Sequence, residues 1–331
     1  MWIECAIGSA LLLGAYDFFK KKSLKRNSVL MGLTVTTVLS ALLTLPSVVT
    51  GYDPYASETF IPWRDDWKLM LKAVIVTVSW LSGLAALKYL PLTTAGTLKA
   101  TRPVFVVLFS VLFMGERLNG WQTAGILAAF VSLFMLSSAS SREGIRFTRS
   151  KGVLYMLVSV ISGVCSALWD KLIMKAMPPV YVLGHTNLYI ALLMLAILLV
   201  TRWVFRPKGA LPVTEDPSGG PVSRPFSLLA REAMQPFVFD VNLVFISLFI
   251  TGADFLYFLA LNQEGALLSV ISIVRRLSVV ITFLLGALFL KERNLGRKAL
   301  ALFVLLVSVL ISLFGSNPDF LSWMQHFSIK Y

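Results

Sequence analysis

The sequence predicts an all-α integral membrane protein with ten transmembrane helices, arranged as two inverted five-helix repeats. Three observations lead to this prediction. Hydrophobic residues make up 57% of the chain and charged residues 14%, with a mean hydropathy of +0.78, which is more apolar than a soluble domain. Apolar runs of about 20 residues, long enough to cross a ~30 Å hydrocarbon core, follow one another along the chain. A short motif also occurs twice, at equivalent positions in the two halves.

The apolar runs give the approximate bounds of ten spans. They are 2–19, 28–50, 69–88, 93–114, 120–138, 152–174, 180–202, 241–262, 266–290 and 296–315. The longest break, 206–236, is rich in proline and glycine, which favours a linker loop. The first run lacks a basic leader segment and a cleavage site, so we expect it to be a retained helix. The tail, 316–331, has an amphipathic pattern typical of a short helix lying on the membrane surface.

The net charge of +13 is concentrated at the ends of the spans. Clusters of Lys and Arg follow the first, fifth, seventh and ninth spans, whereas the break after the second span is acidic. Short clusters of this kind indicate membrane topology rather than a nucleic-acid-binding face. By the positive-inside rule, both termini are predicted to face outward.

The two halves of the chain resemble each other when shifted by 176 residues, which lays Glu116 on Glu292 and Lys99 on Arg275. A slightly shorter shift lays Asp17 on Asp170. The predicted repeats are 1–140 and 141–315, each with five helices. Because five is odd, the second copy must cross the membrane in the opposite sense, an arrangement found chiefly in transporters.

The repeated segments are Leu112–Leu118 (LFMGERL) and Leu288–Asn294 (LFLKERN), each at a helix end and followed by a glycine and another apolar span. In this arrangement the chain resembles the ten-helix EamA type of the drug/metabolite transporter (DMT) superfamily. The resemblance covers nearly the whole chain except the proline-rich loop and the tail after Asn317. It implies transport of metabolites or drugs without ATP and does not fix a substrate. Typical members keep both termini in the cytoplasm, opposite to the orientation that the charges predict.

Charged residues inside the spans are the candidates for substrate binding, because an ionised side chain there costs about 2.5–3.5 kcal/mol on insertion scales. Lys99 and Arg102 lie in the fourth span, and Arg275 and Arg276 lie near the middle of the ninth. Repeat symmetry predicts that Lys99 and Arg275 face each other and form a cationic site for an anion. This pattern is also similar to the phosphate-binding arrangement of triose-phosphate translocators in the same superfamily.

These basic residues also have structural interpretations. Arg102 and one of the two adjacent arginines would extend toward lipid headgroups, or would pair with Asp17, Asp170 or Asp254. Adjacent residues on a helix point about 100° apart. We therefore do not expect Arg275 and Arg276 to contact the same small ligand.

Asp254, in the middle of the eighth span, and His185, in the seventh, are the candidates for proton coupling. The alternative for Asp254 is a salt bridge, and the alternative for His185 is a hydrogen-bonded interior residue. Asp17 and Asp170 are interpreted as topological or capping charges beside lysines. Glu116 and Glu292, each next to an arginine, are interpreted as charge pairs that fix the packing of the repeats.

The predicted function is secondary transport by alternating access, moving a small anionic or zwitterionic metabolite, with export favoured by the family resemblance. The sequence has no phosphate-binding loop for ATP and no zinc motif, so no enzyme activity, cofactor or metal is predicted. One alternative is proton-coupled efflux of lipophilic cations, and another is a non-transporting membrane protein, either a lipid enzyme or a structural partner. The expected location is the cytoplasmic (inner) membrane, as a monomer or homodimer whose partners are the bilayer and the substrate, not nucleic acid.

Overall fold

In the part of the chain that the structure describes, every secondary-structure element is an α-helix. This computed structural model describes residues 2–23, 28–56, 63–89, 98, 101–140, 151–204, 233–234, 238–290 and 295–315. The helices are α1 (Trp2–Ser23), α2 (Val29–Thr50), α3 (Asp66–Tyr89), α5 (Arg102–Met114), α6 (Gly120–Ser140), α7 (Lys151–Ile173), α8 (Pro179–Val204), α10 (Val241–Asn262), α11 (Leu268–Val274), α12 (Leu277–Leu290) and α13 (Leu295–Phe314).

Six of these helices are long and apolar enough to cross a membrane, namely α1, α2, α3, α7, α8 and α10. Two shorter apolar segments, Arg102–Met114 and Leu302–Phe314, accompany them. Apart from the fourth and ninth predicted spans, the helices coincide with the predicted spans to within a few residues, because apolar runs between polar breaks determine both. In the fourth, predicted as 93–114, the described helix α5 begins only at Arg102. The predicted surface helix in 316–331 and most of the predicted linker loop 206–236 lie outside the described residues.

The ninth predicted span is not one continuous helix, which corrects the prediction for 266–290. α11 ends at Val274 and α12 begins at Leu277, with a turn at Arg275 and Arg276 between them. Around this turn the backbone N–H of Arg276 bonds the carbonyl of Ile273, and the N–H of Val279 bonds the carbonyl of Arg276, both at 2.9 Å. These bonds span three residues instead of four, so the helix is tightened and interrupted at its centre.

A similar turn precedes α5 in the first half of the chain. The backbone N–H of Thr101 lies 3.2 Å from the carbonyl of Leu98, and the N–H of Val104 lies 3.0 Å from the carbonyl of Thr101. Shifted by 176 residues, Leu98 and Thr101 correspond to Val274 and Leu277. The two halves therefore have backbone hydrogen bonds that span three residues within one residue of equivalent positions.

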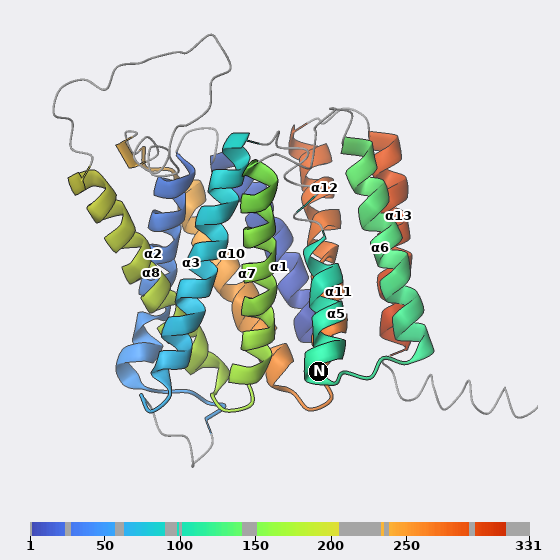
Figure 1. Cartoon of the computed structure of the whole chain (residues 1–331), viewed down its shortest axis with the longest axis horizontal. Helices are drawn as coiled ribbons and strands as arrows, with labels where there is room; N and C mark the ends of the chain where they lie inside the picture. The colour runs from blue at the N-terminus through green and yellow to red at the C-terminus, as the bar shows by residue number, and fades with distance from the viewer. Residues whose placement is uncertain are drawn as a thin grey trace, which may run out of the picture.

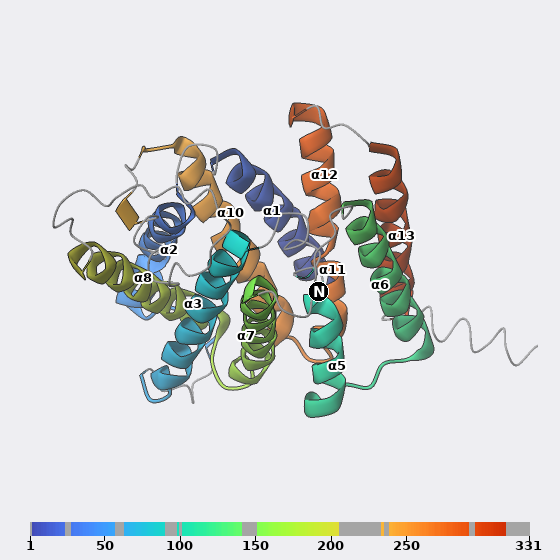
Figure 2. The ribbon, with the colours of Figure 1, turned by 45° about the horizontal axis from the view of Figure 1, so that its top comes forward.

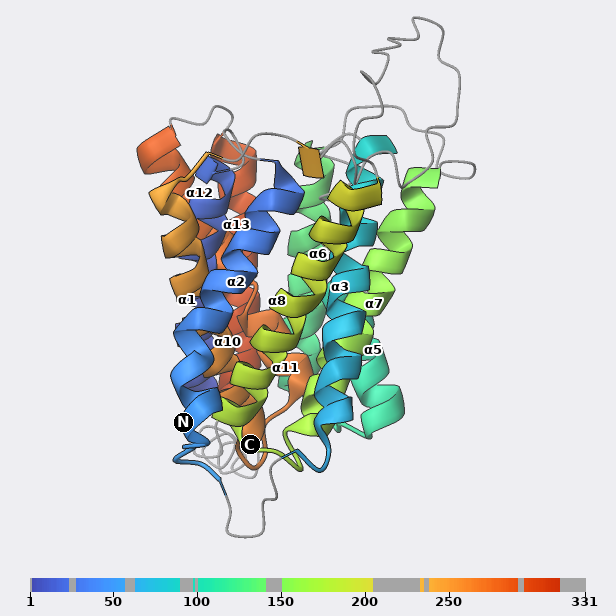
Figure 3. The same cartoon turned by 90° about the vertical axis from the view of Figure 1, so that its left-hand side faces the viewer.

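The long helices lie side by side along roughly one direction (Figures 1 and 3). Successive spans run in opposite directions, with α11 and α12 following one another along the same span. α1, α3, α6, α8 and α12 therefore all end at one side of the bundle, which is uppermost in Figure 1. The start of α1 and the end of α13 both lie at the opposite side. The orientation of the bundle in the membrane stays a prediction from the distribution of Lys and Arg.

The closest helix packing joins the first half of the chain to the second. The main pairs are α1 with α10, α3 with α7, α6 with α13 and α2 with α8. Figure 2 shows α6 beside α13 at one edge of the bundle and α2 beside α8 at the other. The halves are therefore interlocked rather than separate lobes, and the central core is formed by buried residues of both halves, such as Val106, Val164, Ile271 and Leu305.

Small residues let these helix pairs approach closely, as is common in membranes. A Cβ atom added to Gly125 of α6 would lie 2.6 Å from the carbonyl oxygen of Ser308 of α13. Between α3 and α7, the hydroxyl of Ser79 donates to the carbonyl of Ser159 at 2.7 Å, and the hydroxyl of Ser159 donates to the carbonyl of Ser79 at 2.6 Å. Backbone contact and reciprocal hydrogen bonds thus hold the halves together.

We expect Gly125→Ala to lower the free energy of unfolding by about 1–3 kcal/mol, because the added methyl group meets backbone atoms that cannot rotate away. The matched control is Gly32→Ala in α2, where an added Cβ would have no neighbouring atom within 4 Å. That variant should be neutral or stabilised by about 0.5–1 kcal/mol through its helix propensity. Thermal unfolding in detergent measures both, and equal stability of the two variants would contradict the packing of α6 on α13.

Candidate functional site

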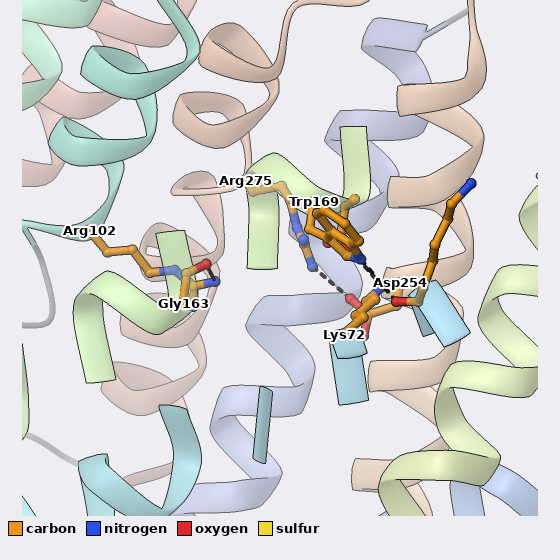
Figure 4. Close-up of polar contacts among 8 residues, drawn as sticks. Lys72, Arg102, Gly163, Trp169, Asp254 and Arg275 are labelled. Atoms are coloured by element: carbon orange, nitrogen blue, oxygen red, sulfur yellow. Dashed lines mark hydrogen bonds and ion pairs between the residues drawn. The ribbon is translucent and has the colours of Figure 1, made fainter. Parts of the chain in front are cut away.

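The break between α11 and α12 is the centre of the candidate site, because it exposes two adjacent arginines inside an otherwise apolar span. Arg275 points toward α10. Its Nη2 lies 3.0 Å from Oδ1 of Asp254 (Figure 4). Its guanidinium carbon lies 4.2 Å from the centre of the Tyr257 ring. Asp254 is thus paired, as the salt-bridge alternative predicted, and the cation–π contact holds the arginine from a second direction.

Arg276 has a different environment. Its Nε atom is buried without a hydrogen-bond partner, and its side chain forms no ion pair or hydrogen bond with any described residue. The positive charges of Arg102 and Arg275 act on it, and so does the negative charge of Asp17 of α1. A guanidinium without a partner in a low-dielectric interior is unfavourable. A nearby anion would therefore stabilise Arg276 more than Arg275, which already has a carboxylate partner.

Arg102 comes from the first half of the chain. Its Nη2 donates a hydrogen bond to the carbonyl oxygen of Gly163 of α7 (Figure 4). The missing side chain at Gly163 makes room, because an added Cβ would lie 2.7 Å from the guanidinium carbon. Arg102 is therefore fixed against a helix backbone, and no carboxylate of the described residues forms an ion pair with it.

Lys99, the predicted counterpart of Arg275, lies outside the described residues. A facing pair of Lys99 and Arg275 therefore stays a prediction. The structure does bring Arg102, Arg275 and Arg276 into one electrostatic group, since the charges of these residues act on one another. We call these three residues the arginine group.

A second ion pair inside the spans was missed by the sequence reasoning. Nζ of Lys72 in α3 lies 2.7 Å from Oδ1 of Asp170 in α7, and the two side chains are only 5% and 8% exposed. Nζ of Lys72 also lies 4.0 Å from the centre of the Phe258 ring of α10. The interpretation of Asp170 as a capping or topological charge is wrong, because its partner is a buried lysine on another helix. The only sequence signal for this pair was a lysine four residues inside an apolar span.

His185 does not lie with the arginines but in a polar cluster between α8 and the start of α3. We call this set the Asp66 cluster, and it consists of Trp63, Asp66, Tyr181, His185 and Tyr189. The carboxylate of Asp66 accepts hydrogen bonds from the hydroxyls of Tyr181 and Tyr189, both at 2.5 Å. The imidazole of His185 stacks on Tyr181 with ring centres 3.9 Å apart and meets the Trp63 ring edge-on at 4.9 Å.

The hydrogen bond of His185 defines its tautomer. Nδ1 lies 3.0 Å from the carbonyl oxygen of Tyr181, which only accepts, so Nδ1 carries the hydrogen. Nε2 is buried and without a partner. This is the hydrogen-bonded interior role that we set beside proton coupling for this residue.

Glu116, the acidic residue of the first repeated motif, caps the broken helix of the other half. Its carboxylate accepts hydrogen bonds from the backbone N–H of Leu268 at 2.6 Å, from the backbone N–H of Ser269 at 3.0 Å, and from the Ser269 hydroxyl. The expected partner, Arg117, is exposed instead. Glu116 therefore fixes repeat packing, as predicted, but through the N-terminal amides of α11 rather than through an arginine. Glu292 lies outside the described residues.

Lys171 of α7 binds the same end of α11. Its Nζ donates to the carbonyl oxygen of Ala266, in the turn between α10 and α11. Ser110 of α5 adds a contact between its hydroxyl and that of Ser269, at 2.6 Å. The short helix that leads to Arg275 is thus held from α5, α7 and the turn after α5.

Comparison with known proteins matches both halves of the chain to one family. A model of the EamA-like transporter family matches residues 1–138 and 150–314, the two-repeat architecture of the DMT superfamily. A protein of Rhizobium johnstonii named "Riboflavin transporter" is 35% identical over 81 residues, which is 24% of this chain and 26% of the relative. A solved structure described as "Crystal structure of protein" superposes with a TM-score of 0.67 at 15% identity, covering 92% of this chain and 94% of the other. The last match concerns the fold alone.

Proposed function

Because the chain belongs to the EamA-like transporter family and is a multi-pass membrane transporter, we propose that it carries a small anionic or zwitterionic metabolite by alternating access. The substrate binds at the arginine group, without ATP, and export is favoured over import by the family resemblance. The expected location is the cytoplasmic membrane.

One observation supports this proposal above the others. The charge of Arg102 from the first half acts together with those of Arg275 and Arg276 from the second, which lie at an interrupted helix, and of these three only Arg275 forms an ion pair with a described carboxylate. Two guanidinium groups that form no ion pair with a carboxylate of the described residues are costly inside an apolar bundle, and an anion relieves that cost. Arginine is suited to the task because its planar fork binds carboxylate or phosphate with two hydrogen bonds.

We further propose that the ten spans form two inverted repeats, 1–140 and 141–315, which rock against each other around the arginine group. The equivalent turns near Leu98 and Val274 support this arrangement, as does the pairing of first-half with second-half helices. Broken helices near the membrane centre are a recurring way to build substrate sites in such carriers.

The alternatives are two other functions, cation efflux and a role without transport, and one other class of substrate. Efflux of lipophilic cations requires a free carboxylate, and the ion pair between Asp254 and Arg275 disfavours it. The relative named for riboflavin makes a planar heterocycle the second candidate substrate, although the similarity spans about a quarter of that protein. A non-transporting membrane protein would not move any solute with saturation after reconstitution.

The test is a thermal-stability screen of the purified protein against phosphorylated metabolites, carboxylates, amino acids, riboflavin and cationic drugs. A substrate anion at about 100 times its Kd should add about 2.7 kcal/mol of stability to the wild type. We expect Arg276→Gln to lose that gain, because it removes the unpaired charge that the anion neutralises.

The matched control is Arg117→Gln, which removes an exposed arginine outside the arginine group and should respond like the wild type. Stabilisation by cations only, or an equal response of all three proteins to anions, would reject the anion site. Stabilisation by riboflavin alone would favour the second candidate.

A further inference from the structure

The two ion pairs inside the spans differ in the fractional exposure of their side chains. The Lys72 and Asp170 side chains are 5% and 8% exposed, whereas those of Arg275 and Asp254 are 19% and 35% exposed. The first pair is closed off, with the Phe258 ring over the ammonium group. The second pair is less enclosed by protein, most of all on its acidic side, so Asp254 is the less tightly held partner.

The geometry of the Arg275–Asp254 pair also favours replacement of Asp254 by another anion. Nη2 of Arg275 makes the single ion-pair contact with Asp254, and Nε of Arg275 has no hydrogen-bond partner. An arginine prefers two parallel hydrogen bonds to one carboxylate. Because the Tyr257 ring holds the guanidinium in place at 4.2 Å, an incoming anion replaces Asp254 rather than pulling Arg275 away.

When an anion takes the place of Asp254 at Arg275, the Asp254 carboxylate loses its ion-pair partner. A carboxylate that loses its arginine in a low-dielectric interior is costly in its charged form. Taking up one proton converts it into a neutral carboxylic acid, and this removes the cost. The negative charge that left Arg275 is restored by the substrate, so the site keeps its net charge.

We infer that the substrate anion and Asp254 compete for Arg275, and that the displaced Asp254 carboxylate binds one proton, so that one proton moves with each anion. The inference rests on the proposed function of the arginine group. For a monovalent anion the step is electroneutral, since one positive and one negative charge enter together. Net export then requires an outward substrate gradient that exceeds the inward proton gradient.

Other titratable groups near α10 have to be distinguished from Asp254. Those that act on it or surround it are Arg102 of α5, Asp170 of α7 with Lys72 of α3, and Tyr257 of α10 itself. The charge of Asp17 of α1 acts on Arg276, α2 has no titratable residue, and the α8 groups Tyr181, His185 and Tyr189 belong to the Asp66 cluster. Asp170 is the closest rival, because it is also a carboxylate in an ion pair.

The experiment measures binding of gluconate and of sulfate to the purified protein from about pH 5.5 to about pH 8.5, a range in which neither anion changes its charge. For the wild type, the apparent Kd should rise with pH by up to about tenfold per unit, since binding takes up one proton. Addition of gluconate to a weakly buffered sample should also remove about one proton per bound anion. In Asp254→Asn, the Kd should be independent of pH and no proton should be taken up.

Asp170→Asn serves as the matched control. It also neutralises a carboxylate in a membrane-embedded ion pair, so it should lose stability but keep the pH slope and the proton uptake of the wild type. If an anion binds the wild type without a pH slope, or if Asp254→Asn keeps the slope, the exchange mechanism is wrong while the anion site stands. If neither anion binds and cations or neutral compounds do, the proposed anion carrier fails, and the exchange mechanism fails with it.

Discussion

Replacing Lys72 by methionine is expected to lower the free energy of unfolding by about 3–5 kcal/mol, because it leaves the Asp170 carboxylate buried without its partner. The ion pair at 2.7 Å joins α3 to α7, one of the helix pairs that hold the two halves together. The remaining carboxylate is surrounded by protein rather than water, since its side chain is only 8% exposed. Unfolding by SDS titration measures the change.

The double variant Lys72→Met, Asp170→Leu should recover most of the loss, because a buried ion pair contributes little more than apolar residues of similar volume. Lys68→Met on the same helix is the surface control. Lys68 pairs with Asp65 at 3.0 Å with both side chains partly exposed, so its removal should cost at most about 1 kcal/mol. A loss at position 72 no greater than that at position 68 would show that the Lys72–Asp170 pair is not buried in the membrane.

Replacing Glu116 by alanine is expected to cost about 3 kcal/mol or more and to abolish anion binding at the arginine group. The carboxylate satisfies two backbone N–H groups and one hydroxyl at the start of α11, and hydrogen bonds to a charged group contribute about 1.5–3 kcal/mol each. α11 has only 7 residues, too few to be stable alone. Loss of its cap therefore frees the segment that positions Arg275 and Arg276. Thermal unfolding and anion-induced stabilisation measure the two effects.

Glu116→Gln separates the charge from the hydrogen bonds. The amide oxygen still accepts from a backbone N–H, so we expect an intermediate loss of stability and weakened but detectable anion binding. Arg117→Gln, which changes the neighbouring exposed residue of the same motif, should leave both properties unchanged. Full anion binding by Glu116→Ala would mean that the end of α11 does not position the arginines.

Most of the helices were predictable from the sequence because a bilayer restricts the backbone structures that can cross it. Backbone groups inside hydrocarbon have to be paired within a helix, so a run of about 20 apolar residues predicts both an element and its length. The interruption at Arg275 and Arg276 was not predictable, because α11 and α12 are both apolar and no proline marks the turn. The contacts around the break come from other elements: Glu116 and Lys171 bind the start of α11, and Asp254 binds Arg275 at the turn.

The sequence by itself determined the membrane class of the protein, the approximate bounds of most of its described helices, the repeated motif and the presence of charged residues inside the spans. These properties depend on neighbours in the chain, namely hydropathy over about 20 residues and the cost of a buried charge. Only the tertiary structure decided which charges neutralise one another. It paired Lys72 with Asp170 and Arg275 with Asp254, put His185 in the Asp66 cluster, and left Arg276 without an ion pair among the described residues. An ion pair is a matter of a few ångströms between side chains of different helices, and that distance is fixed by helix packing, not by any local pattern in the sequence.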